Sequence, residues 1–361
     1  MKIAISAAET SGDLVASALV KSLLELNPEC RIAGMAGDKM AAAGCQILWH
    51  LNQVNVMGFS EVLKKLPSLL RLRKTMVSHF CEQKPDVFIG VDAPDFNFKI
   101  ERQLKARGIK TVHFVSPSVW AWRSGRIKKI KKSTDLMLCM FPFEVEFYKK
   151  HGQQALFVGH PLAEALTPRL GHKQGKKVLL MPGSREAEIK SLLPEMLGAL
   201  RLMQAQDKEV SFSLALANTN LQSWVEEQIT DLDIEISIGD AHQKISEADL
   251  VIVASGTATL EIAMLGVPMV VVYKLSAISY QIAKRLLKTD CISLPNVMLG
   301  KEAVPELIQD KANADNIANF SLRILRADNT QLIAELSSIH TQLNQGSAQK
   351  SAKAILEFIN A

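Results

Sequence analysis

The stretch VFIGVDAPDFN, Val87–Asn97, places a short apolar run directly before a cluster of turn residues. This pattern is typical of a buried parallel strand that ends in a loop. Ligands approach open α/β sheets at the carboxyl ends of such strands, so Asp92 is predicted to lie where chemistry occurs. A simpler interpretation is that Asp92 only caps the following turn or helix.

Similar apolar runs alternate with amphipathic, helix-like stretches along the chain. The predicted strands are Lys2–Ser6, Arg31–Met35, Val87–Val91, Thr111–Val115, Leu136–Met140 and Leu156–Gly159, then Lys177–Met181, Phe212–Leu216, Ile234–Ile238, Leu250–Ala254 and Met269–Tyr273. A polar loop at 168–176 separates the two sets, and after Asn296 only helical periodicity remains. This order predicts two doubly wound α/β domains that face each other, 1–167 and 168–361, with C-terminal helices able to cross back.

Length and composition agree with this organisation. A chain of 361 residues suggests two domains, and its 48% hydrophobic content suits well-packed cores. The five cysteines are scattered without metal-ligand spacing, which predicts reduced thiols in a cytosol and no zinc site. The first residues do not resemble a signal peptide, and no apolar run approaches the ~20 residues that span a bilayer. The net charge of +5 gathers around Arg71–Lys74 and Arg123–Lys132, which suits phosphate groups.

Two turns in the second half have the character of phosphate-binding turns. In the first, a predicted strand ends in Pro182, Gly183, Ser184 and Arg185. In the second, Ser255, Gly256 and Thr257 follow a strand and open a helix that carries Glu261 one turn later. Helix N-termini bind anions, Arg185 can pair with phosphate, and the Glu261 carboxylate suits ribose hydroxyls. Two such turns in one domain predict a nucleotide site, although neither is a Walker A motif.

The first domain carries acidic and aromatic turns instead. Glu9, Ser11, Gly12 and Asp13 follow the first predicted strand, a composition better suited to sugar hydroxyls than to phosphate, although Ser11 or Asp13 could simply cap a helix. Glu9 is the second candidate for a catalytic carboxylate. Trp120 and Trp122 lie in the loop after another strand, where they form either an aromatic wall for the acceptor or a packed loop.

Residues 56–80 combine leucines at helical spacing with basic side chains. Such a helix usually packs against a core, but its leucine density and lack of acid after Glu61 favour contact with a membrane surface. Pro67 is expected to kink or divide the helix. The residues predicted to contact the membrane are Val62, Leu63, Leu66, Leu69 and Leu70.

The motifs ETSGD, GVDAPDFN, SPSVWAWR, PGSR, SGTATLE and SLPN, in this order, resemble the lipid-A-disaccharide synthase family over essentially the whole chain. The resemblance implies two Rossmann-like domains of the glycosyltransferase B type facing a cleft. It implies an inverting transfer that joins UDP-2,3-diacylglucosamine to 2,3-diacylglucosamine 1-phosphate (lipid X) and releases UDP. It also implies a peripheral protein at the cytoplasmic face of the inner membrane of Gram-negative bacteria.

By the same resemblance, Asp92 takes the place of the general base, with Glu9 as the alternative. Ser184, Arg185, Glu261 and Asn296 fall in the UDP-binding region, and residues 56–80 correspond to the membrane-contacting helix. Neither a metal nor a cofactor is expected, and a homodimer is possible.

Three other interpretations account for part of the sequence. A UDP-N-acetylglucosamine 2-epimerase-like enzyme would share the two-domain layout but has no need of the leucine-rich basic helix. A membrane adaptor would not need the nucleotide turns. A nucleic-acid-binding protein would explain the basic stretch at 123–132, which however lacks aromatic residues for base stacking.

Overall fold

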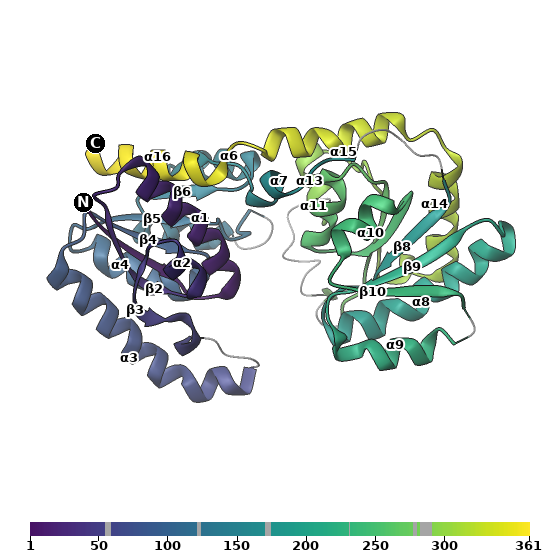
Figure 1. The fold of residues 1–361 in the computed structure, drawn as a ribbon, viewed down its shortest axis with the longest axis horizontal. Helices are drawn as coiled ribbons and strands as arrows, with labels where there is room; N and C mark the ends of the chain where they lie inside the picture. Colours follow the sequence, from purple (N-terminus) through teal and green to yellow (C-terminus); the bar gives the residue numbers. More distant parts are fainter. Residues whose placement is uncertain (55–58, 121–123, 170–174, 231, 277–279, 282–290) are drawn as a thin grey trace. The chain divides into compact units, whose positions relative to one another are not determined.

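The computed structural model describes residues 1–54, 59–120, 124–169, 175–230, 232–276, 280–281 and 291–361 (Figure 1). The chain divides into two units, each built on one parallel sheet. Unit 1 contains Met1–Glu164 together with Asn344–Ala361, and unit 2 contains Ala165–Leu343. The predicted doubly wound α/β class is therefore confirmed. The first segment of unit 1 ends at Glu164, three residues before the predicted boundary after residue 167. Unit 1 also includes Asn344–Ala361.

The sheet of unit 1 has seven parallel strands. In spatial order they are β3 (Gln46–His50), β2 (Arg31–Ala36), β1 (Lys2–Ala7), β4 (Val87–Val91), β5 (Lys110–Phe114), β6 (Leu136–Cys139) and β7 (Gln154–Phe157). Side chains alternate between its two faces, as the period of a strand requires. On one face Ile3, Ile5 and Ile89 pack with helices from both ends of the chain, whereas Ala4 and Phe88 belong to the core on the other face.

Helices cover both faces of this sheet. They are α1 (Thr10–Leu26), α2 (Asp38–Ala42), α3 (Phe59–Gln83), α4 (Pro94–Lys105), α5 (Ile127–Ser133), α6 (Pro142–Lys150), α7 (Pro161–Ala165) and α16 (Ser347–Asn360). Figure 1 shows α16, the yellow end of the chain, beside α1, and buried residues of both helices share one core. Helices α3 and α4 supply the core of the opposite face.

The sheet of unit 2 has six parallel strands. Their order is β10 (Ile234–Ile238), β9 (Ser211–Leu216), β8 (Lys177–Met181), β11 (Leu250–Ala254), β12 (Met269–Tyr273) and β13 (Glu306–Ile308). Its described helices are α8 (Glu186–Gln206), α9 (Gln222–Gln228), α10 (Ala241–Glu247), α11 (Thr257–Met264), α13 (Leu294–Leu299), α14 (Ala314–Arg326) and α15 (Thr330–Leu343). The main core lies between the sheet and the helices α8 and α14.

The structure differs from the sequence-based predictions in three places. Strand β3 was not predicted, because QILWH mixes polar with apolar residues at the edge of the sheet. Strand β13 lies after Asn296, where only helices were expected, and its three residues are too few to give a periodic pattern. Helix α3 runs through Pro67, so the proline does not divide the helix, while a kink there stays a prediction. Pro67 is exposed, and a surface position tolerates the missing hydrogen bond better than a buried one.

Asp13 is buried on α1, and its carboxylate joins two βα segments. It accepts hydrogen bonds from the backbone N–H groups of Gly37, Lys39 and Met40, at 2.8, 3.1 and 3.3 Å. These groups belong to the start of α2, so Asp13 caps that helix rather than its own. The carboxylate is therefore committed to the fold and not to a ligand.

We expect Asp13→Ala to destabilise unit 1 by about 1.5–3 kcal/mol, because it leaves buried N–H donors without an acceptor. Urea denaturation would measure the loss as a lower midpoint of unfolding. Asp13→Asn, which keeps one side-chain oxygen, should lose less. Glu25→Ala on the same helix is the control, since Glu25 is exposed. Equal midpoints for Asp13→Ala and this control would contradict the capping role.

Candidate active site

The order of the strands brings the two candidate carboxylates of unit 1 to the same place. The chain leaves β1 toward β2 and β3 and then returns to β4 on the other side of β1. Ala7 at the end of β1 pairs with Val91 at the end of β4. The loops that carry Glu9 and Asp92 therefore leave the sheet together at the reversal of strand order, which is where open α/β sheets bind ligands.

The backbone at the end of β4 is strained. Asp92 and Ala93 have φ angles of 52° and 42°, in the left-handed region that residues other than glycine rarely adopt. Val115, at the end of the neighbouring strand β5, has φ of 76° and is β-branched, which makes it a stronger outlier. Such positions cost about 1–3 kcal/mol each and persist only where surrounding contacts enforce them.

Asn97 supplies much of that enforcement. Its side chain is fully buried on α4, and its Nδ2 lies 3.2, 3.1 and 2.9 Å from the carbonyl oxygens of Ser6, Val91 and Asp92. The backbone N–H of Asp92 donates to the carbonyl of Phe114 on β5. The strained turn is thus tied to three strands. No role was predicted for Asn97 from the sequence, although an Asn in the first turn of the helix after an Asp-Ala-Pro turn was a usable signal.

The carboxylate of Asp92 has a hydrogen-bond donor and lies close enough to Glu9 to affect its pKa. Ser11 Oγ donates to Asp92 Oδ2 at 3.3 Å. Partial burial raises the pKa of Glu9, and the nearby charge of Asp92 raises this pKa further. Gly12 is buried, and a β-carbon added to it would lie 3.4 Å from the carbonyl oxygen of Val91, so α1 begins close against the Asp92 turn.

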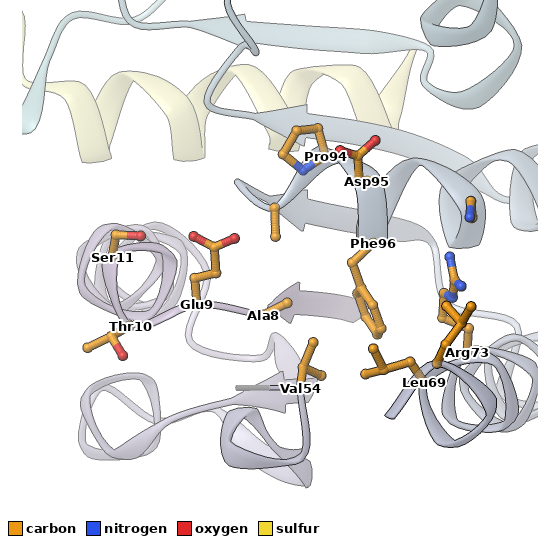
Figure 2. Close-up of a pocket in the computed structure, with 13 residues that line it drawn as sticks. Ala8, Glu9, Thr10, Ser11, Val54, Leu69, Arg73, Pro94, Asp95 and Phe96 are labelled. Carbon is orange, nitrogen blue, oxygen red and sulfur yellow. The ribbon is translucent and has the colours of Figure 1, made fainter. Parts of the chain in front are cut away.

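A pocket of about 720 Å³ opens beside this turn (Figure 2). Its polar wall includes Glu9, Thr10 and Ser11. Its other walls come from α3, α4 and the segment after β3, and comprise Val54, Leu66, Leu69, Arg73, Ala93, Pro94, Asp95, Phe96 and Lys99, with Ala8 beneath. A pocket that is acidic, apolar and basic in turn suits an amphipathic ligand.

A buried polar cluster lies under the Asp92 turn. Ser6, Gly90 and His113 are aligned on adjacent strands and therefore share one face of the sheet. His113 Nδ1 lies 2.6 Å from Glu101 Oε1, and both side chains are fully buried. Burial raises the pKa of Glu101, and its partner His113 opposes that rise. A side chain at Gly90 would collide with Glu101, so glycine is required there for packing.

The loop that carries Trp120 is anchored rather than free. Trp120 is half-buried and packs edge-on against Phe143, with ring centroids 4.7 Å apart. Ser116 Oγ lies 3.0 Å from the hydroxyl of Tyr148. Burial raises the pKa of Glu144 to about 8, and hydrogen bonds from its surroundings, Ser116 and Trp120 among them, moderate the rise. Trp120 thus belongs to a packed loop, while Trp122 lies outside the described residues.

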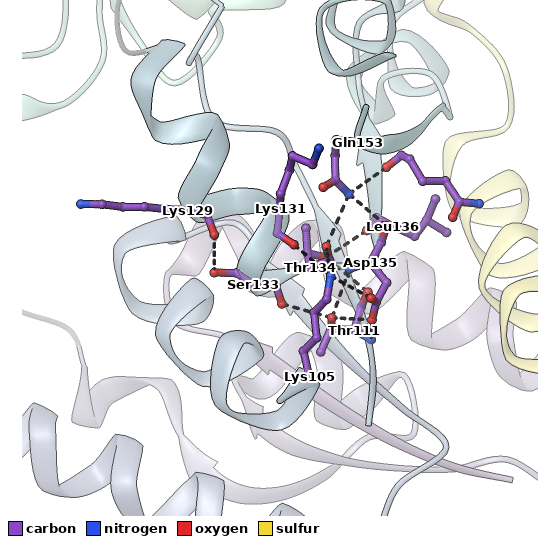
Figure 3. Close-up of polar contacts among 10 residues, drawn as sticks. Lys105, Thr111, Lys129, Lys131, Ser133, Thr134, Asp135, Leu136 and Gln153 are labelled. Carbon is purple, nitrogen blue, oxygen red and sulfur yellow. Dashed lines mark hydrogen bonds and ion pairs between the residues drawn. The ribbon is translucent and has the colours of Figure 1, made fainter. Parts of the chain in front are cut away.

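Several basic residues in and near the stretch 123–132, which was predicted to bind phosphate, make contacts within unit 1 instead. At the opposite edge of the sheet, Asp135 accepts hydrogen bonds from Thr111 and pairs with Lys105 at 2.8 Å (Figure 3). Lys131 Nζ donates to the carbonyl of His151 at 2.9 Å, and Arg126 pairs with Asp95 at 2.7 Å. These contacts weaken the interpretation of the stretch as a nucleic-acid surface.

In unit 2 the strand order reverses between β8 and β11, so the two predicted phosphate turns meet there. Gly183 has φ of 112° and lies close to Ala254 at the end of β11, so glycine is required by conformation. Gly256 is extended, and the space beside its α-carbon is open. The N-termini of α8 and α11 thus flank the carboxyl edge of the sheet, with Ser184, Ser255 and Thr257 in the turns.

The charged side chains of this region have partners within unit 2. Arg185 is 80% exposed and pairs with Glu188 at 3.0 Å. Glu261 Oε2 lies 2.9 Å from His242 Nε2. Tyr273, at the end of β12, was not singled out from the sequence. Partial burial and Glu188 raise its pKa, and Arg185 lowers it, so Tyr273 lies in the same electrostatic environment.

Asn296 lies in the interior instead of facing a ligand. Its Nδ2 donates to Val304 O and to Glu306 Oε1, both at 2.8 Å. Its Oδ1 accepts from the N–H groups of Ala303 and Val304. The amide has two donor hydrogens and two acceptor lone pairs, so all are used. Asn296 of the SLPN motif holds the connection between α13 and β13. The sequence predicted that Asn296 binds UDP, but its side chain has no free donor or acceptor for a ligand.

The segment that was predicted to contact a membrane has two different halves. Toward the end of α3, Met76, Val77 and Phe80 are buried in the core. Toward its start, Leu66 and Leu70 are 42% and 52% exposed, while Leu69 is half-buried and lines the pocket. The side chains of Val62 and Leu63 lie outside the described residues. None of the described helices is long and apolar enough to cross a membrane.

Comparison with known proteins gives similarities over the whole chain. The family model described as lipid-A-disaccharide synthetase matches residues 3–359. Lipid-A-disaccharide synthase of Methylobacillus flagellatus is 40% identical over 376 residues, covering 99% of both chains. Among solved structures, MurG of Acinetobacter baumannii is similar with a TM-score of 0.64 at 15% identity over 99% of both chains. A UDP-GlcNAc 2-epimerase of Neisseria meningitidis has a TM-score of 0.63 at 12% identity, also over 99% of both. At this identity the structural likenesses show the fold alone.

We expect the stability of the protein to fall between about pH 5 and pH 8 because of Glu144. In the unfolded chain this carboxyl ionises near its ordinary pKa, whereas the fold holds the pKa at about 8. Between these values the folded state binds the extra proton, so the free energy of unfolding decreases as the pH rises. Glu144→Gln, which cannot ionise, should lose less thermal stability between about pH 5 and pH 8. Parallel melting curves for the two proteins would contradict this assignment.

Proposed function

The chain belongs to the lipid-A-disaccharide synthase family and is a glycosyltransferase of lipid A biosynthesis, and on this premise we propose which of its residues bind and join the two sugar lipids. The reaction transfers a diacylglucosamine unit from UDP-2,3-diacylglucosamine to lipid X, with inversion and release of UDP. The acceptor occupies unit 1 and the nucleotide occupies unit 2. One contrast supports this assignment of the two substrates to the two units. Unit 1 has an amphipathic pocket beside Asp92, whereas unit 2 has two glycine turns that precede helices.

Asp92 is the general base of this proposal. The acceptor hydroxyl must lose a proton as its oxygen bonds to the anomeric carbon of the donor, and a carboxylate within hydrogen-bonding reach can take that proton. The strained, braced turn fixes the position of the Asp92 carboxylate and so limits the reorganisation needed during the reaction. Ser11 and Gly12 belong to the acceptor side, and Glu9 is the alternative base because its raised pKa brings it closer to neutral pH.

The turns of unit 2 bind UDP. Backbone N–H groups at the start of α11, with the hydroxyls of Ser255 and Thr257, face the pyrophosphate, and the open space beside Gly256 admits it. Ser184 adds a hydroxyl from the neighbouring turn. Arg185 leaves its ion pair with Glu188 and pairs with the diphosphate of UDP. This contact stabilises the negative charge that develops on the leaving UDP. Glu261 exchanges His242 for the ribose hydroxyls.

The location follows from the substrates and from α3. Both sugar lipids carry acyl chains, so the protein works at a membrane surface, which we place at the cytoplasmic face of the inner membrane. The exposed Leu66 and Leu70, next to the exposed Arg71, provide apolar and basic contacts for an anionic lipid surface. An epimerase would have no use for these features, and the family match disfavours that alternative.

We expect Asp92→Asn to reduce turnover by about 10²–10⁴-fold with near-normal affinity for UDP, because Asn keeps the size of Asp but cannot take the proton. Disaccharide formation from UDP-2,3-diacylglucosamine and lipid X would measure turnover, and calorimetry would measure UDP binding. Glu9→Gln is the matched comparison and should have the smaller effect. If Glu9→Gln is the more damaged enzyme, Glu9 is the base. If the wild-type protein forms no disaccharide, the proposed reaction itself fails.

We expect Leu66→Ser combined with Leu70→Ser to weaken binding to vesicles that contain anionic phospholipid, by about tenfold for each leucine. The melting temperature should change little, because both side chains are already exposed. Leu26→Ser is the control, since Leu26 is 53% exposed on another helix of unit 1. Sedimentation with vesicles would measure binding. A double variant that binds as tightly as the control would place the membrane contact elsewhere.

A further inference from the structure

Arg73 is a buried cation in the pocket wall that has no carboxylate partner among the described residues. Only 7% of the residue is exposed, and it projects from α3 beside Phe96, with its guanidinium carbon 5.7 Å from the ring centroid. Burial lowers the pKa of the guanidinium. Arginines this deeply buried are almost always paired with an anion. The side chain is therefore set for an anion that the described part of the protein does not supply.

The surroundings of Arg73 define the kind of anion. Lys99, which lies on α4 and also lines the pocket, is exposed and has no ion pair among the described residues. Asp95 lines the pocket too, but Arg126 pairs with its carboxylate at 2.7 Å. Leu66 and Leu69 from the same helix, together with Phe96, are apolar residues that line the same pocket. A guanidinium can bind phosphate through two parallel hydrogen bonds, in a bidentate contact. The apolar surroundings suit a phosphate that is attached to a lipid.

The pocket also separates its charges. Figure 2 shows Glu9 and Ser11 on one side of the Phe96 ring and Arg73 on the other, with Leu69 below the ring. An acceptor sugar with its reacting hydroxyl near the carboxylates would extend past Phe96 toward Arg73. The acyl chains would then follow Leu66 and Leu69 toward the exposed start of α3.

We propose that Arg73, with Lys99, is the receptor for the phosphate on the anomeric carbon of the acceptor, and that it selects phosphorylated over unphosphorylated diacylglucosamine. This inference rests on the proposed function and assigns a specificity-determining residue to it. The phosphate of a membrane phospholipid has similar chemistry and is the other possible source of the anion. The two sources differ in what they predict, because only the acceptor phosphate affects the choice between substrates.

The test compares two acceptors, lipid X and its dephosphorylated form 2,3-diacylglucosamine, in mixed micelles of a neutral detergent. For the wild-type protein we expect KM to be lower for lipid X. Arg73→Met should raise KM for lipid X about 10- to 100-fold, as expected for loss of a charge-assisted pair, and leave KM for the dephosphorylated acceptor nearly unchanged. For Arg73→Lys, KM for lipid X should lie between the values of the wild-type protein and Arg73→Met, because an ammonium keeps the charge but not the bidentate geometry. Arg102→Met, which removes an exposed charge from α4, should leave both KM values unchanged.

Each outcome is decisive. Equal loss on both acceptors, or no loss on either, overturns the assignment while wild-type disaccharide formation leaves the proposed function intact. Loss of vesicle binding in Arg73→Met, with an unchanged preference between acceptors, assigns the anion to a phospholipid instead. If Arg73→Met does not fold, Arg73→Lys decides, and a variant with the wild-type preference overturns the proposal. As a second measurement, glucosamine 1-phosphate should inhibit the wild-type enzyme more strongly than glucosamine, and equal inhibition counts against the site.

Discussion

The geometry of the candidate active site depends on one buried amide. Asn97 Nδ2 lies within hydrogen-bonding distance of carbonyl oxygens at the ends of β1 and β4 and of Asp92 itself. These contacts hold two successive residues in the left-handed region, at a cost of about 1–3 kcal/mol each. Without such a brace the turn would relax toward ordinary backbone angles, and the Asp92 carboxylate would leave the place where β1 and β4 end. The brace is stable because Asn97 is fully buried, where water does not compete for the carbonyl groups.

Much of this arrangement was predictable from the sequence. Buried parallel strands leave short apolar runs, and the alternation of these runs with helices indicated two doubly wound domains. Because the carboxyl ends of parallel strands share one edge of a sheet, the turns at Asp92, Glu9, Gly183 and Gly256 could be assigned to candidate sites from their place after a strand. The fold class and the family followed from these elements, and both were confirmed.

The remaining features depend on tertiary contacts that leave no local pattern. Asp13 looked like a ligand-binding carboxylate or a cap for its own helix, but it caps α2, 24 residues further along the chain. Asn296 looked like a nucleotide ligand, yet its amide is saturated by backbone and Glu306. Arg73 was one cation in a basic cluster, and only its burial beside Phe96 distinguishes it from the exposed Arg71 and Lys74. Burial and partner choice are properties of the packed chain, so sequence spacing alone could not separate these cases.

The return of the last 18 residues to unit 1 has a consequence for synthesis of the protein. Ala352 and Ile355 of α16 are fully buried against α1 and the first sheet. Domains usually fold in order as the ribosome extends the chain. Here the first unit emerges early but lacks part of its core until α16 leaves the ribosome, after all of unit 2. The nascent first unit therefore keeps an apolar groove exposed until α16 has been synthesised.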